Sequence, residues 1–589
     1  MERIRAFLSA RRALAALLAA AAVLALVPAL QSRLFIGEEW QGVPQVYMDE
    51  YVYYSHVTEA GTGNVLFGNP YLLEHRFDAP LVLFGSTILA ALPLLLGLPL
   101  MWALMANFAV WSIIFAGLYY RLMRELTLPA WGAAAVSLFA YLQSYDQIYR
   151  ISVRQEVLPF LLLFWIALVR FLSLPESRRR AVWLAVAAGA SFYVYGFLWQ
   201  AAVVTLGLVA LYALFCRKWL LFKRTLYASG LGGILGAPAF LYTLWVTTQP
   251  YFWESANRFG LVATHVPVAE VLYSGAWVGL AASLALALWW CVPALRSRTL
   301  AIVLLFVCAS GLALWIVQGS NIITGIVWET GDHLRRFIIV WLPLATSLLM
   351  YAAYEHRAKL QRGMRLLAAG TLALLALANI YFMHHHSHPF REPGALRATW
   401  QEQQRYAAPL RWLEEREPEP VVVWGDSMLF STIHVPVLTR HYVLYVEPAN
   451  YMLMPTDEIR ERYLVSRYFD GATARMLQEE DSMLRHAGRA NTYHVPQTMK
   501  REAALCRLIL LNGGCGAAPT PQELMGQEYF EGLAAQFSDD IVPNIQQYLK
   551  KYQVSYILKD TRHNASWKPE VLGGVLVYQD EYFELYKLP

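Results

Sequence analysis

Residues 47–54 read YMDEYVYY and lie in the first hydrophilic segment of the chain, after an apolar run at 12–30. Most of the chain from there to residue 384 is apolar enough for a bilayer. Because carboxylates are costly near hydrocarbon, acids at a membrane edge usually face water, a cavity or a partner. The adjacent Asp49 and Glu50 therefore predict a site at the membrane surface. A solvated loop with two ordinary acids is the alternative.

The composition indicates a membrane protein with many spans. Of the 589 residues, 57% are hydrophobic and only 15% are charged, whereas a soluble chain of this length carries about a quarter charged residues. The net charge of +5 comes from short basic clusters between apolar runs. We therefore expect a lipid bilayer as a partner, and no nucleic acid.

Apolar runs of about 20 residues are long enough to cross about 30 Å of hydrocarbon. Eleven such runs predict transmembrane helices, near 12–30, 99–121, 127–143, 156–173, 181–197, 199–215, 225–246, 271–294, 299–318, 337–354 and 364–383. The apolar stretch 80–97 is followed at once by another full span, so we predict a helix at the outer interface there. The first run is expected to stay attached as a signal anchor.

Every second connection is rich in Lys and Arg, which predicts that these connections and the N-terminus are cytoplasmic. The basic residues are Arg3, Arg5, Arg11, Arg12, Arg121, Arg124, Arg178, Arg179, Arg180, Arg217, Lys218, Lys223, Arg224, Arg296, Arg298, Arg357, Lys359, Arg362 and Arg365. Counting 80–97 as a span would put alternate clusters on opposite sides. The charges thus favour eleven crossings of the cytoplasmic (inner) membrane, with the C-terminal part outside.

Residues 385–589 are mixed in character and predict one extracytoplasmic α/β domain, beside a membrane domain at 1–384 whose outer loop, 31–98, carries the acidic pair. Helical spacing is found at 400–415 and 544–552, and strand patterns at 420–425, 441–446 and 554–558, with a terminal hairpin at 575–586.

The loops predicted to face outward are rich in charged side chains and histidines. They hold Asp49, Glu50, Glu74, His75, Arg76 and Asp78; then Asp146, Arg150, Arg154 and Glu156; then Glu254, Arg258 and His265; and last Glu329, Asp332, His333, Arg335 and Arg336. Carboxylate can act as a general base, and guanidinium pairs with phosphate through two parallel hydrogen bonds. The pattern suits a reaction that deprotonates one group and expels an anionic one. Alternatively, Arg335 and Arg336 anchor a span at the lipid headgroups.

This arrangement resembles the GT-C superfamily of membrane glycosyltransferases, the broad group of the bacterial aminoarabinose transferases and protein O-mannosyltransferases. The shared features are one span, an outer loop starting with an acidic pair, an interfacial helix, further spans and an extracytoplasmic α/β domain. Local similarities lie at 69–75 before the interfacial helix, 154–158 where the family carries a second acid, 332–337 at a basic span start, and 549–558 in the tail.

The resemblance implies an inverting glycosyltransferase that moves a sugar from a polyprenyl-phosphate-linked donor to a glycan, lipid or protein acceptor on the outer face. Asp49 would take the proton of the acceptor hydroxyl. The carboxylates that would position the acceptor are Glu50, Glu156, Asp146 and Glu74, and the choice between Asp146 and Glu156 stays open. Glu50 and Glu156 could instead hold a divalent cation. The lipid phosphate would be neutralised by Arg335 or Arg336, with His333.

Two other classes of function compete with a transferase. A transporter or flippase for a lipid-linked saccharide needs charged or discontinuous helices at the bilayer midplane, but these spans keep their charges at the ends. A non-catalytic envelope scaffold, whose tail binds a partner, is also compatible with the sequence.

Cysteines and histidines outside the spans give two further expectations. Cys506 and Cys515 fall in the part predicted to face an oxidising compartment, and the Asn-Gly-Gly turn at 512–514 favours a disulfide between them. Two free thiols are the alternative, since a continuous helix would hold the sulfurs too far apart. The histidine tract at 384–388 predicts a membrane-edge loop more than a metal site.

Overall fold

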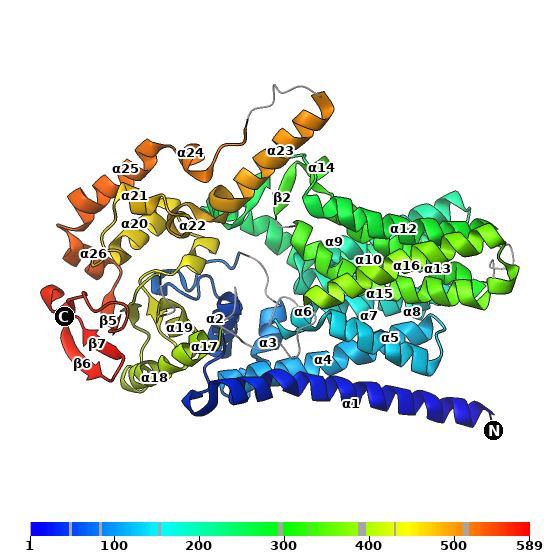
Figure 1. Ribbon diagram of the computed structural model, residues 1–589, viewed down its shortest axis with the longest axis horizontal. Helices are drawn as coiled ribbons and strands as arrows, with labels where there is room; N and C mark the ends of the chain where they lie inside the picture. Colours follow the sequence, from blue (N-terminus) through cyan, green and yellow to red (C-terminus); the bar gives the residue numbers. More distant parts are fainter. Residues whose placement is uncertain are drawn as a thin grey trace.

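The computed structural model describes residues 2–45, 50–81, 85–150, 155–291, 298–328, 330–386, 396–428, 431–510 and 517–589. Long helices form a bundle, and a part that mixes helices with a sheet lies at one end of it (Figure 1). The first helix begins at the opposite end of the bundle (Figure 1).

Each of the eleven predicted spans contains a helix. They are α1 (Glu2–Ile36), α4 (Leu100–Glu125), α5 (Ala130–Gln143), α7 (Val157–Ser173), α8 (Arg178–Val194), α9 (Gly196–Phe215), α10 (Trp219–Val246), α12 (Ala269–Cys291), α13 (Arg298–Gln318), α15 (Thr330–Glu355) and α16 (Arg362–His386). Within the described chain, eight helices are long and apolar enough to cross a membrane by length and composition. The expectation of a polytopic helical membrane protein is confirmed.

The remaining three helices are shorter than a full span. α5 has 14 residues, and α7 and α8 have 17 each. At 1.5 Å per residue, 17 residues reach about 25 Å. Whether these three helices cross the bilayer therefore stays a prediction.

Burial identifies α15 as the centre of the bundle. The most apolar window of α15 is 78% buried inside the protein, whereas those of α1 and α16 are each 28% buried. The outer helices thus keep broad apolar faces for lipid, while α15 is packed on all sides. The basic N-terminal turn of α15 therefore lies at the centre of one end of the bundle.

Short elements cover the end of the bundle that faces the sheet. They are α2 (Glu50–Gly61), α3 (Gly85–Leu95), α6 (Tyr145–Tyr149), α11 (Phe252–Phe259), α14 (Asn321–Thr324), and the antiparallel pair β1 (Leu261–Ala263) and β2 (Ile326–Trp328). α3 has 11 residues, about 16 Å, which is too short to cross the hydrocarbon. The prediction that 80–97 is a short helix and no span agrees with this length.

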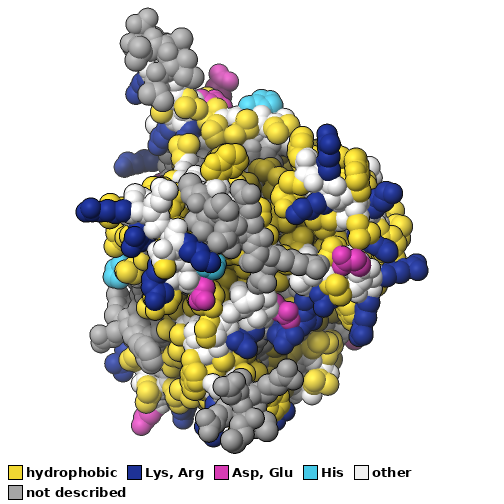
Figure 2. All heavy atoms as spheres, turned by 90° about the vertical axis from the view of Figure 1, so that its right-hand side faces the viewer, with side chains coloured by type: hydrophobic (Ala, Val, Ile, Leu, Met, Phe, Trp, Pro, Cys, Tyr) yellow, Lys and Arg dark blue, Asp and Glu magenta, His cyan; other side chains and the backbone are white. Residues whose placement is uncertain are grey.

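The opposite end of the bundle is rich in basic side chains. Figure 2 views the molecule from that end, where many Lys and Arg side chains and few acids stand out from a largely apolar surface. The N-terminal helix begins there (Figure 1). This distribution has the form expected of a cytoplasmic face, where Lys and Arg gather.

The C-terminal part contains a five-stranded sheet. Its strands are β3 (Val422–Trp424), β4 (Tyr442–Val443), β5 (Val554–Asp560), β6 (Val575–Gln579) and β7 (Phe583–Lys587), in the order β4-β3-β5-β7-β6. β3 pairs in parallel with β4 and β5, and β7 pairs antiparallel with β5 and β6. Its helices are α17 (Leu396–Arg405), α18 (Ala407–Arg416), α19 (Ser431–Leu438), α20 (Thr456–Ser466), α21 (Ala474–Leu477), α22 (Glu480–Arg489), α23 (Val495–Leu510), α24 (Pro521–Met525), α25 (Gln527–Gln536) and α26 (Ile545–Lys551). The expected α/β character is confirmed.

Two details of this part differ from the sequence patterns. Helical spacing at 400–415 is divided between α17 and α18, which meet at Tyr406. The buried hydroxyl of Tyr406 donates to Asp560 at 3.1 Å, which ties the junction to the end of β5. The strand expected at 441–446 is only two residues long, Tyr442–Val443.

The outer loop is part of the C-terminal core. Tyr71 and Leu72 are buried among the hydrophobic residues that cover the sheet, and the carbonyl of Tyr71 accepts a hydrogen bond from the amide of Val443 at 2.8 Å. Glu74 forms an ion pair with Arg462 at 3.0 Å, and only 1% of the Arg462 side chain is exposed. Membrane-proximal and C-terminal segments therefore share one core.

A network of charged groups extends this contact. His75 lies 2.6 Å from Asp78 and 3.1 Å from Glu458, which also accepts from Arg462 at 2.9 Å. Burial lowers the pKa of His75, but the hydrogen bonds to Asp78 and Glu458 outweigh it and raise the pKa to about 9. Burial alone raises the pKa of Glu458, but its contacts with His75 and Arg462 outweigh burial and lower this pKa to about 2. Both groups are thus charged when the loop is docked at neutral pH.

A second clamp joins α11 to the C-terminal part. The guanidinium of Arg258, 3% exposed, donates to the backbone carbonyls of Asn450 at 3.1 Å and Met454 at 2.7 Å. Gly488 has φ +80°, and a Cβ there would lie 2.9 Å from the backbone of Arg258. Only glycine suits both the conformation and the close approach.

Cys506, in α23, is disulfide-bonded. The predicted partner, Cys515, lies outside the described residues, so the pairing itself stays a prediction. Cys216 and Cys308 are free. His384 and His385 are exposed at the end of α16, and His388 lies outside the described residues.

We predict that the outer loop and the C-terminal domain share one side of the membrane. Exposed positions offer a direct test: Glu38→Cys and Glu528→Cys should react with a membrane-impermeant maleimide in intact cells, with Cys216 and Cys308 replaced. Arg179→Cys, the matched control at the basic end, should react only after permeabilisation. If the Glu38→Cys protein is labelled in intact cells and the Glu528→Cys protein is not, the two segments do not lie on the same side of the membrane.

The His75 network predicts a pH-dependent stability. The pKa of His75 is higher in the folded protein than its ordinary value of 6.5, so its contribution is complete below about pH 6.5 and is lost as pH rises through about 9. A pKa difference of one corresponds to ~1.4 kcal/mol, so the effect is on the order of 2–3 kcal/mol. The melting temperature in detergent should fall by a few degrees over this window, and His75→Gln should flatten the fall. An equal fall in both proteins would contradict the network's role.

Candidate active site

A buried ion pair joins the outer loop to the bundle. Glu50 begins α2 and Arg150 follows α6, and their Oε1 and Nε atoms lie 3.0 Å apart. The side chains are only 6% and 14% exposed, respectively. Asp49, the neighbour of Glu50 and the expected base, lies outside the described residues. The first loop and the second loop therefore meet at Glu50.

The other side of α2 is held by the C-terminal part. The hydroxyl of Tyr51 donates to Glu447 at 3.1 Å. Glu447 begins the 3-10 turn Glu447–Tyr451, and burial raises the pKa of its carboxyl group. Further along α2, Glu59 accepts from Tyr442 of β4 at 3.1 Å. The acidic end of α2 is thus fixed from two directions.

The two candidates for the second carboxylate differ in burial. Asp146, in α6, is half-buried, whereas Glu156, at the start of α7, is fully buried. Neither carboxyl oxygen of Glu156 has a hydrogen-bond partner among the described residues. A buried carboxylate without partners is unfavourable, so within the described part of the chain Glu156 is the candidate whose hydrogen bonds are most plainly incomplete. Glu74 lies elsewhere, paired with Arg462 in the C-terminal core.

A cationic cavity lies between the second loop and the centre of the bundle. Its space is about 230 Å³, part of it open to solvent, and its lining is Gln147, Val157, Leu158, Tyr195, His333, Arg336 and Phe337. Residues of the second loop and of the start of α15 are brought together here. We call it the cationic cavity, because Arg336 supplies a permanent positive charge.

The basic residues of α15 differ in their relation to this cavity. Asp332 forms ion pairs with both Arg335 and Arg336. Arg336 is 10% exposed and lines the cavity, whereas Arg335 is 33% exposed and is not part of the lining. The guanidinium of Arg336 donates to Nδ1 of His333 at 3.4 Å, and His333 is also hydrogen-bonded to the hydroxyl of Tyr195. The two arginines, equivalent in the sequence, are therefore distinct in the structure.

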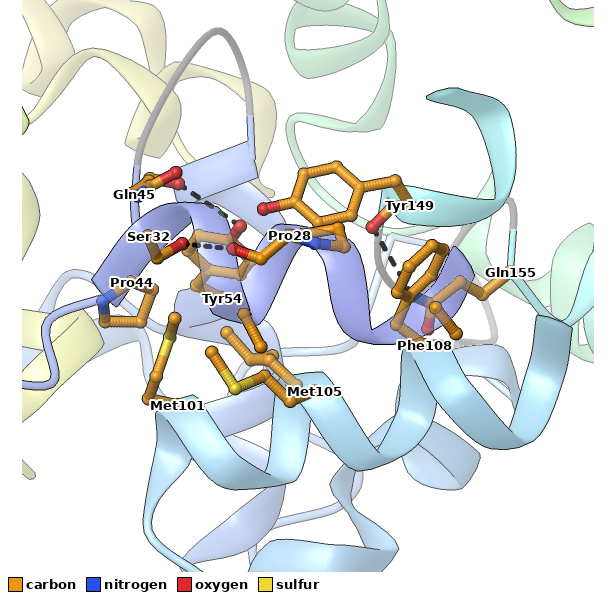
Figure 3. A pocket seen from close by; sticks show the side chains of 13 residues that line it. Pro28, Ser32, Pro44, Gln45, Tyr54, Met101, Met105, Phe108, Tyr149 and Gln155 are labelled. Atoms are coloured by element: carbon orange, nitrogen blue, oxygen red, sulfur yellow. Dashed lines mark hydrogen bonds between the residues drawn. The ribbon is translucent and has the colours of Figure 1, made fainter. Parts of the chain in front are cut away.

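A larger cavity lies on the acidic side. Figure 3 shows it below α2, between α1 and α4. Its space is about 460 Å³, part of it open to solvent, and its lining is Ala25, Pro28, Ala29, Ser32, Pro44, Gln45, Tyr54, Met101, Leu104, Met105, Phe108, Tyr149 and Gln155. We call it the apolar cavity, since no Lys, Arg, Asp or Glu is among these described residues.

One wall separates the two cavities. It consists of α6 and the start of α7, and we call it the α6–α7 wall. Gln147 lines the cationic cavity and Tyr149 the apolar one; two positions along a helix turn the side chain by about 200°. Gln155 and Val157, on either side of Glu156, likewise belong to different cavities. Arg150 directly follows α6 and forms the ion pair with Glu50, so this end of the wall reaches the start of α2.

The described acids at this site form no metal-binding group. Among the described residues, the one cluster of three ligands is Glu402, Asp560 and His563 in the C-terminal part. There Arg562 pairs with Asp560 at 2.5 Å and with Glu402 at 3.4 Å, so a cation already compensates the carboxylates. Glu50 is paired with Arg150. Among the described residues, Glu50 and Glu156 do not fit the alternative role of holding a divalent cation.

Several partners at this site had no signal in the sequence. Tyr51 and Glu447 are 396 positions apart, and Tyr195 meets His333 across 138 positions. Arg150 stood among the outward residues, but nothing in its spacing indicated Glu50 as its partner.

Comparison with known proteins gives structural similarities only. No protein-family model matches the chain, and no curated protein matches it. Among solved structures, the chain is similar to the Archaeoglobus fulgidus oligosaccharyltransferase in the apo form, with TM-score 0.43 and 11% identity over 93% of this chain and 70% of that chain. It is also similar to ArnT from Cupriavidus metallidurans in the apo state, with TM-score 0.42 and 14% identity over 96% of this chain and 97% of that chain. For the same ArnT bound to undecaprenyl phosphate, the TM-score is 0.39 and the identity 13%, over 95% of this chain and 97% of that chain. Similarity at this level assigns neither a substrate nor a residue role to this chain.

Proposed function

We propose that the protein is an inverting glycosyltransferase that moves a hexosyl or pentosyl group from a polyprenyl-phosphate-linked donor to an acceptor on the outer face of the cytoplasmic membrane. One observation carries the proposal: buried carboxylates and a cationic cavity lie on a common wall at the end of a bundle of membrane-length helices. Such a place is reached by a lipid-linked substrate from the bilayer and by an acceptor from the outer side.

The donor's phosphate belongs in the cationic cavity. Arg336 offers a planar guanidinium, which can hold phosphate oxygens through two parallel hydrogen bonds. Its present partner, the carboxylate of Asp332, is 45% exposed, so an incoming phosphate can replace that partner without leaving a buried acid unpaired. His333 and Tyr195 add hydrogen-bonding groups beside it.

The chemical step is a single displacement at the anomeric carbon. The carboxylate of Asp49 takes the proton from the acceptor hydroxyl as that oxygen bonds to the anomeric carbon. The bond from this carbon to the phosphate oxygen breaks, and its electron pair leaves with the polyprenyl phosphate. Attack opposite the leaving group inverts the configuration. Arg336 stabilises the charge that develops on the phosphate.

Glu50 and Glu156 have supporting roles. Glu50 is held by Arg150, which fixes the start of α2 and the backbone that leads to Asp49. The carboxyl group of Glu156 is buried between Gln155 and Val157, which line the two cavities, and we assign it the positioning of the acceptor. Asp146, half-exposed in α6, is the less suitable second carboxylate.

Asp49 provides the first test. Asp49→Asn keeps the shape of the side chain and removes the base, so turnover should fall ~10²–10⁴-fold with normal expression. The measurement is mass spectrometry of lipid carriers and envelope glycans, with donor consumption followed in purified membranes. Glu38→Gln, at an exposed acid of the same loop, is the matched control and should retain activity.

Retained turnover in Asp49→Asn would exclude Asp49 as the base and return the role to Glu50 or Glu156. A transporter or an envelope scaffold predicts no sugar transfer by the native protein at all, and that result would overturn the proposed function.

Arg336 and Arg335 provide the second test, because only the former lines the cationic cavity. Arg336→Ala should weaken donor use at least tenfold, and Arg336→Lys should restore it incompletely, because lysine lacks the two-pronged geometry. Arg335→Ala is the matched control, with a much smaller effect. Donor titrations in membrane vesicles measure this. Equal effects of the two alanine variants would assign both arginines to headgroup anchoring.

A further inference from the structure

The apolar cavity is built from matching stripes of two membrane helices. α1 contributes Ala25, Pro28, Ala29 and Ser32, and α4 contributes Met101, Leu104, Met105 and Phe108. Each set has the spacing i, i+3, i+4, i+7, which places its members on one face of a helix. The cavity therefore follows the gap between α1 and α4 along the membrane helices (Figure 3).

The residues next to these stripes face outward and are apolar. Leu26 and Leu30 of α1 are 56% and 60% exposed, and Trp102 of α4 is 54% exposed. On helices of membrane-crossing length, such side chains are suited to lipid contact. The gap between α1 and α4 thus lies beside the hydrocarbon of the bilayer, and a lipid chain can enter the cavity sideways.

The upper end of the cavity is polar and lies near the acidic pair. Tyr54 lines it and is one helical turn from Glu50 in α2. The side-chain nitrogen of Gln45 is buried near Tyr54, whereas the side-chain oxygen of Gln155 is buried at the other end of the cavity (Figure 3), and neither atom has a hydrogen-bond partner among the described residues. The amide nitrogen of Gln45 is a donor, so it suits a hydroxyl oxygen at the end of the cavity near Tyr54.

Charge distinguishes the two cavities. The donor is anionic at its phosphate, and Arg336 supplies the matching charge on the far side of the α6–α7 wall. The described lining of the apolar cavity contains no Lys or Arg, so a phosphate there would be buried without a counter-charge. A hydroxyl-bearing headgroup meets no such penalty.

We propose that the acceptor is a membrane lipid, and that the apolar cavity between α1 and α4 holds its hydrocarbon chain. The chain lies along the two stripes, and the headgroup hydroxyl reaches Gln45 and the start of α2. The acceptor and the donor thus approach from the two sides of the wall and meet where it ends, at Glu50 and Arg150. This inference rests on the proposed function and narrows the acceptor from glycan, lipid or protein to lipid.

The first test fills the cavity and probes it with lipid. The full-length protein is placed in vesicles containing phosphatidylethanolamine with a diazirine in its acyl chain, and adducts are mapped after illumination. In the native protein we expect adducts at Met101 and Met105. Ala29→Trp fills the cavity and should reduce them at least fivefold. Leu30→Trp, at the exposed neighbouring position, should leave them unchanged, and adducts at the lipid-facing Trp102 should be equal in all three proteins.

Adducts at Met101 and Met105 that persist in Ala29→Trp would overturn the inference, because the probe would then be reaching them from outside the cavity. Loss of these adducts on addition of excess polyprenyl phosphate would also overturn it, since the occupant would be the donor's chain.

The second test measures sugar transfer in the same vesicles. Ala29→Trp should lower the formation of glycolipid at least tenfold while binding of polyprenyl phosphate is unchanged, and Leu30→Trp should resemble the native protein. Normal transfer by Ala29→Trp, or equal transfer to a water-soluble acceptor without a chain, would overturn the lipid acceptor and leave the transferase intact. Absence of any transfer by the native protein would instead overturn the proposed function.

Discussion

The burial of the Glu50 carboxylate is the constraint on which the rest of the site depends. Removing one ion from water costs several kcal/mol, and only a well-placed counter-charge offsets this. Arg150 meets the requirement at 3.0 Å. The pair forces α2, from the first outer loop, to lie against α6, from the second. Loss of either partner leaves a buried charge, at a cost of ~3–5 kcal/mol, so the junction of the two loops is rigid.

That junction also requires the C-terminal part. Tyr51 follows Glu50 and donates to the buried Glu447, and Arg258 binds the backbone on the far side of the same 3-10 turn. A shift of α2 toward the bundle would therefore break its contact with Glu447, and a shift toward the C-terminal part would break the ion pair with Arg150. Effective catalysis depends on reacting groups held within a fraction of an ångström. The second part of the protein thus contributes to the site by restricting the helix that carries the acids.

The sequence was informative where local pattern alone decides structure. Apolar length and basic connections predicted all eleven bundle helices, and alternation predicted β5 and the terminal hairpin. Pairing across long distances had no local signal: the antiparallel pair of β1 and β2 joins two distant segments of only three residues each. The same holds for Arg335 and Arg336, whose adjacent positions on α15 turn them by about 100° and give only one of them to the cationic cavity.

Satisfied and unsatisfied polar groups are unevenly distributed. Arg258 and Arg462 are almost completely buried, and each has several hydrogen-bond acceptors around its guanidinium. At the start of α7, Glu156 and Gln155 are buried with side-chain oxygens that lack partners among the described residues, and the side-chain nitrogen of Gln45 on the opposite side of the apolar cavity is another such atom. Leaving such an atom unpaired costs ~1–3 kcal/mol, a cost that the docking contacts avoid. Such atoms also occur elsewhere in the described chain, for example the hydroxyl of Ser274, but those of Gln45 and Gln155 belong to the lining of the apolar cavity, where the proposed lipid acceptor would bind.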